Sequence, residues 1–337
     1  MIQQSTAQLD MELHFDHKLT KVKQLADHLQ KAITVNDLKA GEKLPSINFL
    51  SKKHEVSRDT VFKAFKLLKE IGLIDSNQGK SYFVTAATTD ILILLDEYSQ
   101  FKEALFTSFR NQLPLTYRVD LLFHQYNENL FNTIIKETAG HYSKYLVMNY
   151  NNETFSEALK RIDPQRLILL DFGNFDKQGY SYICQDFDEN FYDALVTIKD
   201  RLRKYEKLVF VFNKSHKHPK SSKAYFEKFC RDYDFNYLIT DEFTENMNVE
   251  KGNLYIAIKQ SDVVNIIKSF RRENFSPGAE AGIIAYNDNP IYEVVADGIS
   301  SISIDFRLMG AMASQFVLSG ESIQTYLPTN VIIRNSL

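Results

Sequence analysis

Eight short apolar runs between residues 91 and 288 constrain the fold of this chain more than any other feature. Helix-like stretches separate them, and they read ILILLD, RVDLLF, KYLVMNY, RLILLDF, KLVFVFN, FNYLITD, NLYIAI and AGIIAYND. Continuous apolar runs are typical of parallel strands that are covered on both faces, and strands that alternate with helices predict an α/β sheet. Eight strands are too many for one five- or six-stranded unit, so the sequence predicts two α/β lobes with a cleft between them.

The N-terminal segment follows a different pattern, which predicts three helices and a hairpin. A first helix carries Leu25 and Leu29 at helical spacing, a second begins at Ser46, and a third begins at Ser57 and stops at Gly72. Two extended runs then flank residues 77–80, which is typical of a hairpin. This order of elements is the layout of a winged helix-turn-helix.

The third helix opens with a polar turn, and a DNA-reading role explains it. In helix-turn-helix proteins the N-terminal residues of the second helix of the motif contact base edges in the major groove. Arg58 has the paired donors that fit a guanine edge, whereas Lys63 suits the phosphate backbone. The alternative is that Ser57 is only a cap and Arg58 only a solvated charge. The candidate DNA-binding residues are Ser46, Ser57, Arg58, Thr60, Lys63, Gly79 and Lys80.

The distribution of charge favours a polyanionic partner for the same segment. Between Lys18 and Val84 there are thirteen Lys and Arg against seven Asp and Glu, a net charge of +6. The rest of the chain beyond Val84 has 27 bases and 33 acids, a net charge of −6. A small basic domain beside a larger acidic one is therefore predicted to meet DNA through the basic part.

Residues 40–84 resemble the DNA-binding domain of the GntR family of bacterial transcription regulators. The family pattern G-x-x-L-P-S, V-S-R-x-T-V, L-x-x-x-G-L-I and a glycine-containing wing is met by Gly41, Leu44, Pro45, Ser46, Val56, Ser57, Arg58, Thr60, Val61, Leu68, Gly72, Leu73, Ile74, Gly79 and Val84. The chain departs from it at Ile47 and Asn48, where the family carries Glu-Arg, and at Ser81, the place of a second wing glycine. It also has Phe62 where a basic residue is usual; this side chain either lies against thymine methyl groups or packs on the wing.

The larger part of the chain resembles the effector domain of the LacI/GalR family, which is shared with periplasmic sugar-binding proteins. The resemblance rests mainly on AGIIAYNDNPIYEV and GISSISIDFRLMGAMASQFVL, and the combination is similar to the arabinose-responsive repressors. It implies a repressor that binds a palindromic operator as a homodimer and responds to a monosaccharide or sugar phosphate. The expected domains are a winged helix over residues 1–85, a linker over 86–90 and a two-lobed LacI-like domain over 91–337.

Polar and aromatic residues that follow the apolar runs are the candidates for an effector site. In open α/β sheets, ligands lie at the carboxyl ends of the strands. Carboxylates, amides and bases there can bond sugar hydroxyls, and aromatic faces can cover a pyranose ring; the alternative for each residue is a strand-end cap. The candidates are Glu97, Tyr98, Phe101, Asn149, Asp171, Asp188, His216, Lys223, Asn287, Asp288 and Asp305, with Asp288 as the central acceptor.

The remaining motifs bound the function further. The chain has no P-loop, G-x-S-x-G, H-E-x-x-H or Rossmann glycine pattern, so no catalytic residue and no cofactor are predicted. Cys184 and Cys230 form no CxxC pair, and no long apolar span or secretory signal is present, so we expect a reduced cytoplasmic protein without a metal site or membrane contact. Two alternatives stay open: a sugar- or nucleotide-processing enzyme, and a sugar-binding protein whose basic head does not read DNA.

Overall fold

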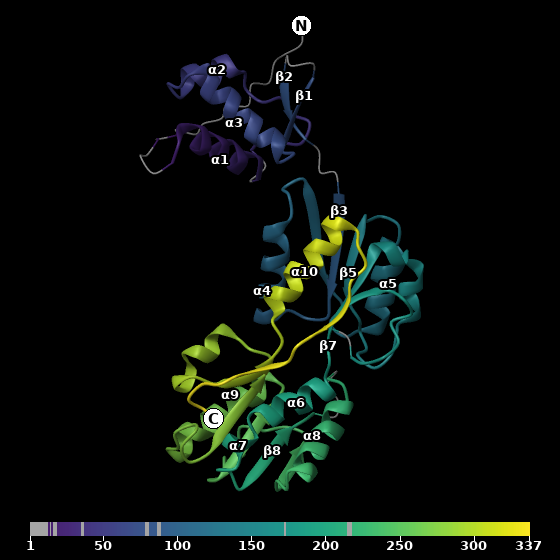
Figure 1. Ribbon diagram of the computed structural model, residues 1–337, viewed down its shortest axis with the longest axis vertical. Coiled ribbons are helices and arrows are strands. Elements are labelled where there is room, and N and C mark those ends of the chain that lie inside the picture. Colours follow the sequence, from purple (N-terminus) through teal and green to yellow (C-terminus); the bar gives the residue numbers. More distant parts are fainter. Residues whose placement is uncertain are drawn as a thin grey trace. The chain divides into compact units, whose positions relative to one another are not determined.

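The computed structural model describes residues 13, 15, 19–34, 37–77, 81–85, 89–171, 173–213 and 218–337. The chain divides into two compact units, Met1–Ile91 with Leu113–Asp120 and Leu92–Gln112 with Leu121–Leu337 (Figure 1). The predicted linker over 86–90 contains residues 86–88, which lie outside the described residues. Among the helices of the described part, none is both long and apolar enough to cross a membrane.

The first unit contains the predicted winged helix-turn-helix, which we call the head. Its helices are α1 (Lys21–Thr34), α2 (Ile47–Lys53) and α3 (Arg58–Glu70), and its hairpin is β1 (Ile74–Asn77) paired antiparallel with β2 (Ser81–Val84). Gly72 has a φ of +73°, which lets the chain leave α3 and turn into β1 without the steric cost that a Cβ would add.

One apolar cluster holds the head together. Successive helical turns of α3 bury Val61, Ala64, Phe65 and Leu68, and this stripe packs against α1, α2 and the hairpin. The buried members are Leu25, Ala26, Leu29, Ala32, Leu38, Leu44, Leu50, Val56, Val61, Ala64, Phe65, Leu68, Leu73, Ile74 and Val84. Because the buried stripe occupies one side of α3, the polar first turn and the lysines of the helix are left on its exposed side.

Two six-stranded sheets follow the head within the described residues, and they belong to the second unit except at residues 89–91 and 117–120, which fall in the first. The first has the order β13 (Gln324–Leu327), β7 (Ser181–Gln185), β6 (Leu167–Leu170), β5 (Lys144–Met148), β3 (Thr89–Leu95) and β4 (Tyr117–Phe123). The second has the order β14 (Asn330–Ile332), β12 (Ser300–Ser303), β11 (Gly282–Tyr286), β10 (Asn253–Ala257), β8 (Lys207–Val211) and β9 (Tyr237–Thr240). The two orders correspond strand for strand, so β6 and β11 occupy equivalent positions.

Alternation of buried side chains explains why the strands read as continuous apolar runs. In β8, Leu208 and Phe210 pack into the cluster that includes α6 (Glu189–Thr197) and α8 (Ser221–Asp232). Val209 and Val211 of the same strand pack on the other face, into the cluster that includes α9 (Gln260–Glu273). Both faces of the sheet are therefore covered, as expected for parallel strands.

Helices also cover the first sheet, and one of them arrives from the far end of the chain. On one side α5 (Glu128–Thr138) packs against the strands, and on the other α4 (Gln100–Gln112) packs along α10 (Phe306–Ser319). A Cβ at Gly310 would lie 2.2 Å from the carbonyl oxygen of Leu105, so only glycine allows this approach of α10 to α4. The predicted architecture, a winged helix followed by two α/β lobes, is confirmed.

Three connections join the two lobes of the second unit. The chain passes from β7 to α6, from β12 to α10, and from β13 to β14. Each passage leaves one lobe at the end of a strand and enters the other lobe.

Candidate functional site

The N-terminus of α3 presents the first candidate site. The Ser57 hydroxyl oxygen accepts from the backbone N–H of Thr60 at 3.0 Å and lies 2.8 Å from the Thr60 hydroxyl. Ser46 caps α2 in the same way, accepting from the N–H of Phe49 at 3.2 Å. These caps fix where both helices begin and leave Arg58, the first residue of α3, exposed.

The exposed side of α3 continues with alternating charges and one aromatic ring. The Lys63 ammonium lies 2.7 Å from the Asp59 carboxylate, one turn earlier on the helix. The Phe62 side chain is 49% exposed, so packing against the described residues of the wing does not bury it. Gly79 and Lys80, the predicted wing-tip contacts, lie outside the described residues.

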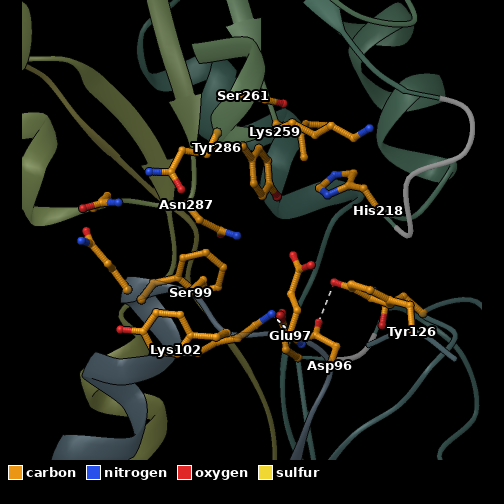
Figure 2. A pocket seen from close by; sticks show the side chains of 18 of the residues that line it. Asp96, Glu97, Ser99, Lys102, Tyr126, His218, Lys259, Ser261, Tyr286 and Asn287 are labelled. Atoms are coloured by element: carbon orange, nitrogen blue, oxygen red, sulfur yellow. Dashed lines mark hydrogen bonds and ion pairs between the residues drawn. The ribbon is translucent and has the colours of Figure 1, made fainter. Parts of the chain in front are cut away.

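The second candidate site is a cavity of about 360 Å³ in the second unit. Its lining comes from the strand ends and following loops of both lobes, with Asp96, Glu97, Lys102 and Tyr126 facing Lys259, Ser261, Tyr286 and Asn287 across the cavity in Figure 2. This volume falls in the range of small-molecule pockets. The remaining lining residues are Tyr98, Ser99, Gln100, Phe101, Asn152, Asp171, Phe187, His218, Ile258, Gln260, Asn289 and Tyr292.

A buried charge cluster forms the floor of the cavity in the first lobe. The Lys102 ammonium pairs with Asp96, and both side chains are at least nine-tenths buried. The Tyr126 hydroxyl donates to Asp96 Oδ2 at 2.7 Å (Figure 2), and burial together with this carboxylate raises the pKa of Tyr126. Since Lys102 neutralises Asp96, the pair contributes little net charge to the cavity. Burial also raises the pKa of the neighbouring Glu97 carboxyl.

Asp171 and Asn287 occupy equivalent positions in the two lobes. Asp171 directly follows β6 and Asn287 directly follows β11, with left-handed φ angles of 50° and 62° that Asp and Asn tolerate. Their backbone N–H groups donate to the neighbouring strand at Ile183 (3.2 Å) and Ile302 (2.8 Å), respectively. In each residue the Oδ1 atom is buried and has no hydrogen-bond partner among the described residues. The cavity therefore contains two fixed acceptors in need of donors, one from each lobe.

Burial shifts the protonation of the Asp171 carboxyl. The residue as a whole is partly exposed, but its Oδ1 atom is buried. Loss of solvation raises the pKa of Asp171 to about 7, because the attraction of Lys102 only partly offsets it. The carboxyl group thus titrates near neutral pH in the ligand-free protein.

An aromatic wall closes the cavity between the lobes. The rings of Phe187 and Tyr286 are stacked at 6.3 Å, and His218 lies edge-on to both, at 4.9 and 4.8 Å. The buried Gln185 on β7 donates from Nε2 to the Tyr286 hydroxyl at 2.8 Å, which links the first sheet to the second. The wall gives the cavity an apolar side.

A buried lysine holds the loop that follows Asp171. Lys177 is 4% exposed, and its ammonium donates to the carbonyl oxygen of Gly173 and, at 2.8 Å, to the hydroxyl of Tyr326 on β13. The rings of Phe175 and Tyr182 lie 4.5 and 5.3 Å from the same ammonium. These contacts fasten the loop to the two strands that lead out of the first lobe, β7 and β13.

The sequence-predicted effector residues divide into those that line the cavity and those that do not. Glu97, Tyr98, Phe101, Asp171 and Asn287 line it. Asn149 is buried, and its side chain bonds the backbone of its own loop at Asn151 and Thr154. His216 lies outside the described residues.

Three further predicted residues lie in or directly before the first turn of a helix. Asp305 caps α10 by accepting from the N–H groups of Arg307 and Leu308. Asp188 precedes the first residue of α6, and Lys223 lies 3.9 Å from Glu227 on α8. None of the three lines the cavity.

Asp288 requires a correction, since the sequence predicts it as the central acceptor of the cavity. It does not line the cavity; its Oδ1 and Oδ2 atoms accept from the Arg334 guanidinium at 2.7 and 3.1 Å, and Oδ1 also accepts from Ser301. Burial raises the pKa of Asp288, but these donors outweigh burial and keep the pKa below its usual value. The left-handed turn at Asn287 presents that residue to the cavity instead.

Replacing Asp288 by Ala should therefore reduce stability and leave ligand binding intact. Arg334 is only 13% exposed, so loss of its carboxylate partner should cost about 1.5–3 kcal/mol. Thermal melts should show a lower Tm, and a double variant with Arg334→Ala should lose less than the two single variants together. A wild-type Tm combined with a tenfold weaker response to ligand would contradict this role.

Several cavity residues are missing from the sequence prediction. Asp96 ends the run ILILLD and Lys259 follows the run NLYIAI. The strand-end rule that selected Asp171 therefore also applies to both residues. Lys102, Tyr126 and His218 had no such signal, because a helix turn or a loop brings them to the strand ends.

The sequence of the head matches a known protein family. Residues 21–84 match the model of bacterial regulatory proteins of the gntR family. The match covers α1 to the end of β2 and so includes both capped helices and the hairpin. No curated protein matches the sequence.

Solved structures share the fold of the second unit. The trehalose repressor from Escherichia coli is 10% identical with a TM-score of 0.59, over 72% of this chain and 99% of that chain. A LacI family transcriptional regulator from Lactobacillus casei with bound sucrose is 14% identical with a TM-score of 0.61, over 74% and 100%. Another from Arthrobacter sp. FB24, in complex with lactose, is 14% identical with a TM-score of 0.58, over 74% and 99%. At these identities the likeness shows the two-lobed fold of LacI-type regulators.

Proposed function

We propose that this chain, whose residues 21–84 are a gntR-family helix-turn-helix domain, is a DNA-binding transcription regulator that responds to a small sugar. Two sites carry the function, one in each unit. The head reads DNA through α3, and the second unit binds the effector in the cavity between its lobes.

The geometry of α3 supports DNA reading. Its first turn is fixed by a serine cap, and Arg58 projects from that turn with no buried role. A guanidinium at the N-terminus of a recognition helix can donate two parallel hydrogen bonds to guanine O6 and N7. Exposed lysines on α2 and α3, including Lys52 and Lys66, add the phosphate contacts that position such a helix.

The single observation that carries the effector proposal is the pair of unpartnered acceptors, Asp171 Oδ1 and Asn287 Oδ1. They come from equivalent strand ends of opposite lobes and both belong to the cavity lining. A neutral polyol can donate a hydroxyl to each, while its apolar face lies on the aromatic wall of Phe187 and Tyr286. LacI family regulators with the same fold hold sucrose and lactose.

Binding of a sugar to both lobes supplies the switch. A ligand that bridges Asp171 and Asn287 stabilises one relative arrangement of the lobes, and such differential affinity is what allostery requires. We further propose a cytoplasmic homodimer that binds a palindromic operator, since two-fold protein symmetry matches two-fold DNA symmetry. In this proposal the regulator is a repressor that the sugar releases.

A thermal-shift screen of pentoses, hexoses, deoxyhexoses and their phosphates tests the effector proposal. A sugar present at about 100 times its Kd should stabilise the folded protein by about 2.7 kcal/mol. For a unit of this size that corresponds to a rise in Tm of roughly 5–10 °C. If no compound of the panel raises the Tm, the cavity does not bind a simple sugar.

Replacing Asp171 by Asn should weaken the response to the sugar and remove its pH dependence. Hydrogen bonds to a charged acceptor are worth about 1.5–3 kcal/mol, so the half-effective sugar concentration should rise about ten- to a hundredfold. Sugar hydroxyls favour the ionised carboxylate, so wild-type affinity should increase about tenfold from pH 6 to pH 8 as Asp171, with a pKa of about 7, loses its proton. Titration calorimetry across this pH range measures both effects.

The pH dependence of the free energy of unfolding without ligand gives a second test of the Asp171 carboxyl. The folded-state pKa of Asp171 lies above its unfolded value, so the free energy of unfolding should fall as pH rises from about 4 to 7, and Asp171→Asn should remove this loss. Asp305→Asn is the matched control, because it alters a strand-end aspartate outside the cavity and Asn caps helices equally well. Equal pH profiles for wild type and Asp171→Asn would show that the pKa of Asp171 is not raised in the folded protein.

A further inference from the structure

The helix α3, which is the proposed recognition helix, carries an exposed aromatic side chain that has no role in the DNA contacts proposed above. Phe62 is 49% exposed although its neighbour Val61 is fully buried. Phe49 on α2, which is exposed to a similar degree, has the Lys53 ammonium 6.0 Å from its ring centroid. Phe62 instead lies on the face of α3 that carries Arg58 one turn earlier and Lys66 one turn later.

The position of Phe62 fixes what its ring can meet. Arg58 and Phe62 are four residues apart, so their side chains lie on the same face of α3, about 6 Å apart along the axis. When the first turn of α3 lies against base edges, as proposed above, the second turn reaches a neighbouring base pair of the same groove. The neighbouring Asp59 and Lys63 side chains pair with each other at 2.7 Å, and the Phe62 ring remains 49% exposed.

A phenyl ring has no donor or acceptor, so it reads only the apolar feature of the major groove. That feature is the C5 methyl group of thymine, which distinguishes a T·A pair from the other pairs by shape and hydrophobicity. We propose that Phe62 is a specificity-determining residue that selects a thymine methyl group beside the base that Arg58 reads. This inference rests on the proposed entry of α3 into the major groove.

Replacement of thymine by uracil tests the inference, because it deletes the methyl group and keeps every hydrogen-bonding atom. The full-length protein first selects its site from a library of random duplexes, and the selected duplex is resynthesised with uracil at one thymine position of both half-sites at a time. At one position, wild-type affinity should fall about fourfold per half-site, the value of one buried methyl group. Fluorescence anisotropy measures each affinity.

Variants assign the effect to the ring. Phe62→Ala should bind the thymine and uracil duplexes equally, whereas Phe62→Leu, which keeps an apolar contact, should retain part of the difference. Phe49→Ala is the matched control, a similarly exposed ring on α2, and it should retain the full difference. Circular dichroism establishes that each variant is folded.

Three results would overturn the inference. Equal affinity of the wild type for every uracil duplex would show that no methyl group is read. A full thymine preference in Phe62→Ala would assign the reading to another residue. A wild-type protein that selects no duplex at all would overturn the proposed function, and this inference with it.

Discussion

Arg58→Ala should reduce operator affinity more than any other single substitution in the head. Arg58 is exposed at the first residue of α3 and is proposed to donate two hydrogen bonds to one guanine in each half-site. Each such pair contributes about 1–3 kcal/mol of discrimination, so a dimer on a two-fold site should lose about 2–6 kcal/mol, or roughly thirty- to twenty-thousandfold in affinity. Base preference should relax at the position that Arg58 reads.

Arg58→Lys separates charge from geometry in this experiment. A lysine keeps the attraction to phosphate but lacks the planar fork, so it should recover part of the affinity and none of the guanine preference. Selection from random duplexes followed by anisotropy measures preference and affinity in the same variants. If the folded Arg58→Ala protein kept its DNA affinity and its guanine preference, the proposed contact between the first turn of α3 and guanine would be wrong.

The affinity for DNA should depend strongly on salt concentration. The head is basic while the whole chain has a net charge of −3, so its lysines and arginines should displace counterions from the phosphates. A dimer that makes about six phosphate contacts should lose about a thousandfold in affinity between about 50 and 200 mM salt. The slope of log K against log salt concentration gives the number of contacts.

Lys63→Ala supplies the control for the salt prediction. The Lys63 ammonium is held by Asp59 in the free protein and is proposed to contact phosphate in the complex. Its removal should weaken all sequences alike and reduce the salt slope by about one for each head. An affinity that is flat across the salt range would contradict electrostatic binding by the head.

Local sequence patterns predicted the architecture because helix caps, turn residues and the spacing of buried side chains can be recognised in short stretches of sequence. In the head, the capping serines and Gly72 set the helix limits, and the stripe of α3 sets its buried face. In the lobes, β8, β10 and β11 are buried on both sides and are apolar beyond their first residue. These strands could therefore be recognised in the sequence. The strands β7, β12, β13 and β14 were not among the eight runs, because their sequences SYICQ, SSIS, QTYL and NVI are short and contain polar residues.

The cavity was only partly predictable for a related reason. A strand-end rule found Glu97, Asp171 and Asn287, whose positions depend on the strands that precede them. It was wrong for Asp288, because the left-handed turn at Asn287 directs the next residue toward Arg334, which is 46 positions away in the sequence. Long-range pairs of this kind leave no local pattern.

In the proposed switch, a sugar bound between the lobes changes the affinity of the heads for DNA. The most direct test is an anisotropy titration of the selected duplex with full-length protein, with and without a sugar that raises the Tm in the thermal-shift screen. The sugar should weaken operator binding by about five- to 150-fold, the usual range of allosteric coupling. A sugar that stabilises the protein but leaves operator affinity unchanged would contradict the claim.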